Sequence, residues 1–325
     1  MKVLGINFGG RANQRCEIMV KEALFGAKEA GAEVEFVRTV GMRIDPCTGC
    51  GACSASRGGN VHCVRKDDYA ALEEKVLDAD GIIIAAPVFS VGTTGQMKNF
   101  YDRFGAAHDR AQLNVEQAKR IAAGKTGDAL LDQRYFKDRY VAYISVGGAD
   151  TPHWVSLGLP IMNEFGVSSY MKVVGQMDAY AQGVRTNPVL DEPMMAHTRE
   201  LGRRVAQAIG KPYEEVEWFG DEGVCPYCHT NSVMLNALPD IYCTTCGARG
   251  TMGVEDGKIA LHWLPASDPR QESRTLMQGL DAHCREIAHM MEVCIPKLTE
   301  YKDVIAEREK KYREFDKYIQ EMDEA

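Results

Sequence analysis

The run "GIIIAAPVF" at residues 81–89 is the feature that most limits how this chain can fold. It is continuously apolar and rich in β-branched residues, which is typical of a parallel strand covered on both faces. Amphipathic segments such as 15–31 and 67–80 separate it from the other strand-like runs. Those runs are 2–8, 32–40, 140–148 and, as an expected edge strand, 169–180. The alternation predicts an α/β fold built on a doubly wound parallel sheet.

Three loops rich in glycine and small residues follow strands of this sheet, at 7–17, 86–98 and 145–154. Ligands of such sheets bind outside the carboxyl ends of the strands. The first loop combines two glycines with arginines just before a helix, which favours a phosphate site. It is neither G-x-G-x-x-G nor a Walker loop, and this disfavours a dinucleotide or a nucleoside triphosphate. The other two loops let a flat ligand approach the backbone.

Eight of the eleven cysteines fall into two tight groups. No signal peptide and no apolar run of about 18 residues can be assembled, so we expect a cytoplasmic protein without structural disulfides. In a reducing compartment such spacing indicates metal binding. In the first group, three C-x2-C-spaced thiols can bind three corners of one [4Fe-4S] cubane, and a glycine-rich loop brings the fourth. Structural zinc is the alternative. The group is Cys47, Cys50, Cys53 and Cys63.

The second group lies in "VCPYCHTNSVMLNALPDIYCTTC", where two C-x2-C pairs stand fourteen residues apart. A hairpin turn at Asp256-Gly257 follows between two strand-like runs. Paired knuckles and a hairpin predict a zinc ribbon, with rubredoxin-type iron on the same four thiolates as the alternative. "CPYC" also matches a glutaredoxin motif, but the βαβ context of that motif is missing. The ligands would be Cys225, Cys228, Cys243 and Cys246.

The order from Gly5 to Cys16, the cysteine segment 45–68 and "APVF…GQMKNFYDR" at 86–103 resemble the iron-sulfur flavoproteins, a branch of the flavodoxin-like NAD(P)H-dependent FMN reductases. The resemblance covers about residues 1–185. It implies a flavodoxin-like fold, FMN phosphate in the first loop, the isoalloxazine ring against the other two, and a [4Fe-4S] cluster that approaches the FMN of a neighbouring subunit in a homodimer or homotetramer. The implied cofactor-binding residues are Asn7, Gly9, Gly10, Arg11, Gln14, Arg15, Cys16, Pro87, Val88, Phe89, Ser90, Gly92, Thr93, Gly147 and Gly148.

The chain is expected to comprise three parts. Residues 1–210 form the FMN-binding domain, with a helical insertion at 104–139. Residues 211–265 form the zinc ribbon, and 266–325 form a helical region whose apolar spacing after residue 298 suits packing or a dimer contact. The Asp102-Arg103 pair is interpreted as an ion pair that fixes the second FMN loop.

The predicted function is that of an oxidoreductase. A net charge of −8 gives no general attraction to nucleic acid or anionic lipid, so neither is expected as a partner. A flavin exchanges one or two electrons, so FMN and a cluster together would relay electrons from ferredoxin or NAD(P)H to a small-molecule acceptor. Tyr101 and His153 are the candidate catalytic side chains. The alternatives are an NAD(P)H-dependent flavin or quinone reductase with structural zinc only, and a non-enzymatic redox sensor or scaffold.

Overall fold

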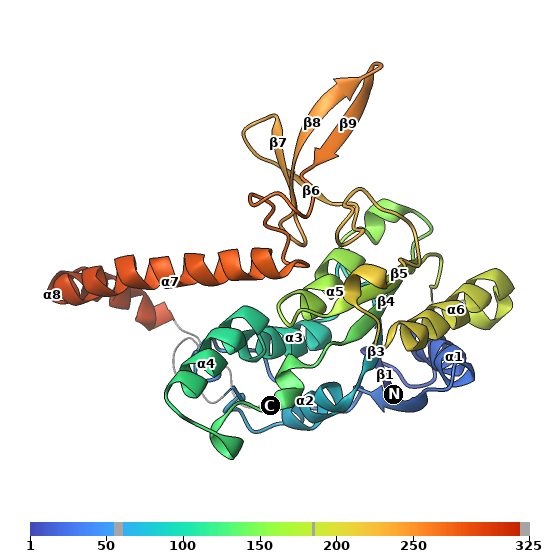
Figure 1. Ribbon diagram of the computed structural model, residues 1–325, viewed down its shortest axis with the longest axis horizontal. Coiled ribbons are helices and arrows are strands. Elements are labelled where there is room, and N and C mark those ends of the chain that lie inside the picture. Colours follow the sequence, from blue (N-terminus) through green and yellow to red (C-terminus); the bar gives the residue numbers. More distant parts are fainter. Residues whose placement is uncertain (55–60, 184–185, 319–325) are drawn as a thin grey trace. The chain divides into compact units, whose positions relative to one another are not determined.

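The computed structural model describes residues 1–54, 61–183 and 186–318, which divide into two units, Met1–Leu280 and Asp281–Ala325. The first unit contains a five-stranded parallel sheet in the order β2-β1-β3-β4-β5 (Figure 1). This is the flavodoxin strand order, so the predicted fold class is confirmed, and β5 is the expected edge strand. The strands are β1 Lys2–Asn7, β2 Glu33–Arg38, β3 Gly81–Pro87, β4 Tyr140–Val146 and β5 Lys172–Ala179.

Helices cover both faces of the sheet, which is why β3 is apolar at every position. Ile83 of β3 packs into the cluster formed with α1 (Arg15–Glu29) and α6 (Glu192–Ala208). Ile82 and Ile84 point to the opposite face and the cluster formed with α2, α3 and α5. These three helices are α2 Tyr69–Asp78, α3 Gly95–Ala107 and α5 Gly158–Val167.

Helix α2 begins two residues later than the sequence pattern predicts. The carboxylates that precede it bind the chain on the far side of the cysteine segment: Asp67 accepts the Asp45 N–H at 2.8 Å, and Asp68 accepts the Arg43 N–H at 2.7 Å. Both ends of the cysteine segment are therefore held together at its base. The insertion after α3 contains α4 (Arg110–Ala122) and the 3-10 turns Gly127–Ala129 and Gln133–Phe136.

A second, antiparallel sheet in the order β6-β7-β8-β9 follows the first (Figure 1). Its β8–β9 hairpin turns at Asp256-Gly257, as predicted, with both residues at positive φ. The linker that leads into this sheet pairs with β5, because the Phe219 N–H donates to Val174 O at 2.9 Å. A Cβ at Gly175 would lie 2.2 Å from Phe219 O, so only glycine permits this approach. The strands are β6 Val233–Leu235, β7 Asp240–Cys243, β8 Arg249–Glu255 and β9 Lys258–Trp263.

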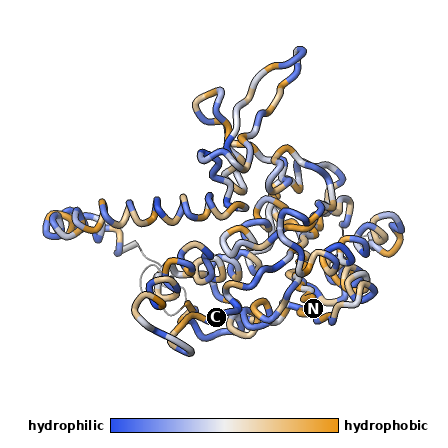
Figure 2. Tube along the Cα trace, in the orientation of Figure 1, coloured by the Kyte–Doolittle hydropathy of each residue, from blue (hydrophilic) through white to orange (hydrophobic). Residues whose placement is uncertain are grey.

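Helix α7 (Met277–Glu300) starts in the first unit and continues through the second, where its trace alternates hydrophilic and hydrophobic residues (Figure 2). The sequence predicts one continuous helical region after residue 298. In the described residues the helix ends at Glu300 and resumes as α8 (Lys302–Glu309) and a 3-10 segment, Lys310–Tyr318. Further 3-10 turns are Pro152–Trp154, Pro188–Leu190 and Tyr213–Glu215. Within the described ranges, no helix is long and apolar enough to span a bilayer.

Candidate active site and metal centres

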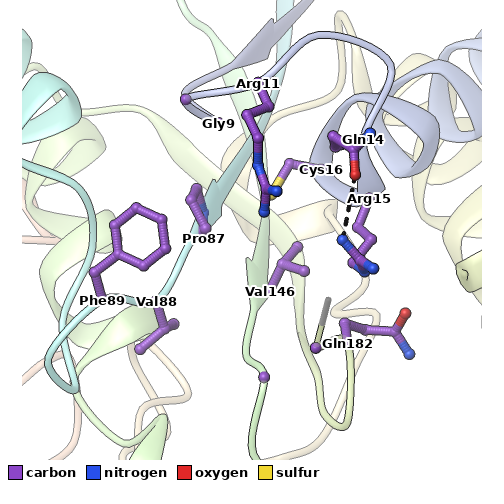
Figure 3. Close-up of a pocket in the computed structure, with 13 residues that line it drawn as sticks. Gly9, Arg11, Gln14, Arg15, Cys16, Pro87, Val88, Phe89, Val146 and Gln182 are labelled. Carbon is purple, nitrogen blue, oxygen red and sulfur yellow. Dashed lines mark hydrogen bonds between the residues drawn. The ribbon is translucent and has the colours of Figure 1, made fainter. Parts of the chain in front are cut away.

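A cleft opens at the carboxyl ends of β1, β3 and β4 (Figure 3). It gathers residues from all three loops that the sequence singles out. Ten of the fifteen predicted cofactor-binding residues line it, together with three that were not predicted. The lining is Gly9, Gly10, Arg11, Gln14, Arg15, Cys16, Pro87, Val88, Phe89, Val146, Gly148, Gln182 and Gly183.

Two buried side chains fix the first loop of the cleft. Asn7 is fully buried, and its Oδ1 accepts the Gly9 N–H at 2.8 Å. Glu17 accepts the Asn13 N–H at 3.0 Å and the Arg38 Nε at 2.8 Å. Hydrogen bonds from Arg38 and Lys21 lower the pKa of Glu17 to about 2, so the carboxylate stays charged at neutral pH. The loop is therefore shaped before any ligand binds.

The donors on this loop fit the phosphate of FMN. Helix α1 begins at Arg15, and in the described structure the side chain of the N-cap residue Gln14 does not satisfy its first N–H groups. Arg15 Nε is buried without a hydrogen-bond partner in the described chain. A Cβ at Gly10 would meet no described atom within 4 Å, and the Arg11 side chain extends into the cleft (Figure 3). Unsatisfied N–H groups and arginines at a helix N-terminus match a phosphate dianion.

A tight turn places Phe89 at the side of the cleft. The Phe89 N–H donates to Gly92 O at 2.8 Å, while Ser90 and Val91 take positive φ values of 50° and 73°. Positive φ is unusual for a β-branched residue, so the backbone of this turn is strained at Val91. The turn leaves the Phe89 side chain 62% exposed, with its ring available to a flat ligand. Figure 3 shows Pro87 and Val88 beside it.

The other predicted cofactor-binding residues surround the cleft without lining it. Asn7 braces the first loop, and the Thr93 hydroxyl donates to Met97 Sδ at 3.3 Å. Ser90 and Gly92 belong to the tight turn. Gly147 packs under Val155, where a Cβ would lie 2.6 Å from a methyl group.

Sequence reasoning missed Val146, Gln182 and Gly183 as cleft residues. Gln182 and Gly183 follow β5, and the Gln182 N–H donates to Gly147 O at 2.8 Å. A fourth loop therefore closes the cleft. The glycine after the run 169–180 was the one signal that could have indicated it.

The two candidate catalytic side chains lie elsewhere. Tyr101 is buried in the core on α3, where burial raises its pKa and Lys98 stands 4.7 Å from the ring centre. His153 is exposed in the loop after β4 and contacts Trp154. Cys16 lines the cleft, but burial raises the pKa of its thiol to about 12, so it is neutral there. The described lining offers no charged acid or base besides the arginines.

One face of α3 holds the base of the first cysteine group. Gln96 donates to Thr39 O at 2.7 Å, and Asn99 donates to Ile44 O at 2.9 Å. One turn further, Arg103 donates to Asp45 O at 3.2 Å. The interpretation of Asp102-Arg103 as a mutual ion pair is wrong, because Arg103 pairs with Asp67 on the side facing the core and Asp102 pairs with Lys98 at the surface.

The four thiols of this group differ in exposure, and in the described chain they do not form a compact ligand set like that of the second group. Cys47 and Cys50 are exposed, Cys63 is partly exposed and Cys53 is buried. Burial and the neighbouring thiolate charges raise the pKa of Cys53. The thiolates of a cubane bind different irons, so they stand farther apart than four ligands of a single ion. Gly49 and Gly51 take positive φ and let the backbone curl closely around a cluster, so the segment fits such a site.

The second cysteine group forms a compact site in the antiparallel sheet. All four sulfurs are buried and lie within 4.8 Å of one another. Cys225 and Cys246 are 3.7 Å apart, and Cys228 and Cys243 are 3.4 Å apart. Four thiolates around one tetrahedral zinc, at about 2.3 Å, would be separated by about 3.8 Å, so these residues fit a single four-coordinate ion. Iron bound by four thiolates takes the same tetrahedral geometry.

The second cysteine group is joined to the parallel sheet and its helices. Arg274 donates through both terminal nitrogens to Glu164 of α5, at 3.0 and 3.2 Å, and its N–H donates to Cys246 O at 2.7 Å. On β5, Gln176 donates to His229 O at 2.8 Å. A change in this cysteine group would therefore reach α5 and β5, which support the cleft loops.

The chain is similar in sequence and in structure to known flavin-dependent reductases and iron-sulfur flavoproteins. Residues 1–159 match the family model of NADPH-dependent FMN reductase. A flavone synthase of Aspergillus candidus is 30% identical over 88% of both chains, and an iron-sulfur flavoprotein of Methanocaldococcus jannaschii is 27% identical over 66% of this chain and 97% of its own. A solved structure of a flavone reductase superposes over 100% of both chains, with a TM-score of 0.79 and 29% identity.

Proposed function

Because the chain belongs to the NADPH-dependent FMN reductase family that includes the iron-sulfur flavoproteins, and is a flavin-dependent oxidoreductase, we propose that it acts on a flat, conjugated ketone of the flavone class. The observation that carries the proposal is the full-length similarity to a flavone reductase. That similarity extends beyond residues 1–159 and therefore includes the antiparallel sheet. The relative named as a flavone synthase supports the same compound class, because a flavone is what its name says it makes.

The proposed reaction reduces the carbon–carbon double bond next to the ketone. NAD(P)H and a proton would be consumed, and NAD(P)+ and the saturated ketone would form. The carbon farther from the ketone gains the hydride, and the carbon beside it gains the proton. Bound FMN supplies the two-electron chemistry and can also accept single electrons.

The chain's own residues would bind and orient the reactants. Arg11, Arg15 and the first N–H groups of α1 hold the phosphate, while Val146 and Gly148 form the apolar floor. The exposed Phe89 ring offers a stacking surface for a planar substrate. The described cleft holds no charged acid, so solvent is the expected proton source.

We further propose that Cys47, Cys50, Cys53 and Cys63 hold a [4Fe-4S] cluster and that Cys225, Cys228, Cys243 and Cys246 hold zinc. The cluster would let ferredoxin replace NAD(P)H as the electron donor, since iron-sulfur clusters pass single electrons. The proposed assembly is a homodimer or homotetramer in which the cluster serves the FMN of a neighbouring subunit.

The test is anaerobic turnover of the FMN-loaded protein with NADPH and flavone, with the saturated product detected by mass spectrometry. Phe89→Ala should lower kcat/KM for flavone roughly 10-fold, because about 1.4 kcal/mol of stacking is lost. Phe25→Ala is the matched control, since Phe25 is 55% exposed and lies on α1 away from the cleft lining. Rapid reduction of a quinone without any reduction of flavone would contradict the proposal and favour the quinone-reductase alternative.

A further inference from the structure

The last turn of α3 carries a cation that is directed at one thiol of the first cysteine group. The Arg103 side chain is 0% exposed, and its Nε donates to Cys63 Sγ at 3.3 Å. Burial of a guanidinium is costly unless its donors are paired, and the Cys63 sulfur is the acceptor that pairs Nε. A cysteine thiolate that ligates iron carries such charge.

The guanidinium is fixed from three other sides. Asp67 accepts two of its hydrogen bonds, at 2.5 and 2.9 Å, and its carboxylate is also fully buried. Asp45 O accepts a third, and the Tyr69 ring lies 4.1 Å from the guanidinium carbon. The Tyr69 hydroxyl is held in turn by Glu73 at 2.7 Å. Arg103 therefore cannot swing away from Cys63 without breaking several buried contacts.

We propose that Arg103 is a positioning residue that raises the reduction potential of the cluster by its hydrogen bond to the Cys63 sulfur, while Asp67 limits the size of this effect; the inference rests on the [4Fe-4S] cluster proposed above. Reduction adds one electron to the cluster and makes its sulfurs more negative. A donor with positive charge stabilises that reduced state more than the oxidised state. The carboxylate of Asp67 opposes it, because it is a negative charge paired with the same guanidinium.

The test is a redox titration of the anaerobically purified full-length protein, followed by electron paramagnetic resonance of the reduced cluster. Arg103→Met should shift the midpoint potential to a more negative value, and Asp67→Asn should shift it to a more positive one. A merely structural role would not produce shifts of opposite sign. If Arg103→Met fails to retain iron, Asp67→Asn still tests the proposal, because it keeps the arginine and its acceptors Asp45 O and Cys63 Sγ.

Arg65→Gln is the matched control, since Arg65 lies in the same segment, pairs with Asp45 at 2.9 Å and donates to no sulfur within the described residues. The midpoint potential of the Arg65→Gln variant should equal that of the unmodified protein. Unchanged potentials in a protein that contains iron and sulfide would overturn the role of Arg103 alone. Equal shifts in Arg65→Gln and Arg103→Met would also overturn it. Absence of sulfide from the unmodified protein would overturn the cluster and this inference together.

Discussion

The two cysteine groups use the same C-x2-C spacing but differ in how far the protein alone organises them. The second group is buried, and its sulfurs converge on one point between the strands of a small sheet. The first group lies on a loop that is held at its base and through Ser54 and Cys63, and two of its thiols are exposed. The difference teaches that knuckles joined by β-strands bring four sulfurs together without a metal, whereas the loop would leave the proposed cluster to draw its exposed thiols into place.

The FMN cleft resembles the second cysteine group in this respect. Asn7 and Glu17 shape its phosphate loop through buried hydrogen bonds to backbone N–H groups. Substitutions in the second cysteine group and in the cleft loop should therefore lower the free energy of unfolding. Substitutions in the first group should instead lower the amount of bound cofactor.

Cys228→Ser should lower the free energy of unfolding by about 3 kcal/mol or more, since a structural metal site contributes folding energy directly. The variant should also lose one metal ion per chain, and Arg274 and Gln176 would transmit the disturbance to α5 and β5. Urea unfolding and elemental analysis measure both effects. Cys294→Ser is the control, because Cys294 is exposed and belongs to neither group. An unchanged unfolding curve for Cys228→Ser would contradict a structural role.

Arg15→Met should weaken FMN binding roughly 10- to 100-fold, because a charge-assisted hydrogen bond to phosphate is worth about 1.5–3 kcal/mol. Quenching of FMN fluorescence on titration with apoprotein measures the affinity. Arg120→Met serves as the comparison, since Arg120 pairs with Glu116 on α4. Equal FMN affinity in the two variants would mean that Arg15 does not contact the phosphate.

Glu17→Gln should lower the free energy of unfolding at pH 7 by about 1–2 kcal/mol, after allowance for solvent screening of Arg38 and Lys21. The folded-state pKa of Glu17 is depressed from 4.5 to about 2, so its contribution is present above pH 4.5 and is lost as the pH falls towards 2. The stability difference between the two proteins should therefore close across this range. A difference that stays constant from pH 7 to pH 3 would show that the carboxylate charge is not responsible.

Cys50→Ser should change the unfolding free energy of the cluster-free protein by less than about 0.5 kcal/mol, because its side chain is exposed. The same variant should lose its iron and sulfide when purified anaerobically. Iron analysis beside urea unfolding measures the two effects separately. A large loss of stability without cofactor would contradict the difference drawn between the two groups.

Much of the fold follows from the sequence because its signals are local. The apolar run at β3 predicts a strand covered on both faces, and the Asp256-Gly257 turn predicts the β8–β9 hairpin. The glycine and arginine pattern after β1 predicts a phosphate loop, and ten of the predicted residues do meet in one cleft. Periodicity and turn residues suffice for these features because each depends on neighbours in the chain.

The remainder depends on contacts between distant segments, which periodicity does not encode. Arg103 meets Asp67 and Cys63 across 36 and 40 positions, so the adjacent Asp102 was the misleading partner. Gln182 reaches the cleft through a loop that follows the edge strand. These side chains find their partners only when the sheet brings the loops together.

The most direct test of the account is analysis of iron, acid-labile sulfide and zinc in the anaerobically purified protein, with electron paramagnetic resonance after reduction by dithionite. The account predicts about four irons, about four sulfides and about one zinc per chain, and a reduced-cluster signal that is lost in Cys50→Ser but retained when the exposed Cys294 is replaced by serine. About two zincs per chain and no sulfide would contradict the proposed electron relay. That result would leave a nicotinamide-driven flavin reductase with two structural metal sites.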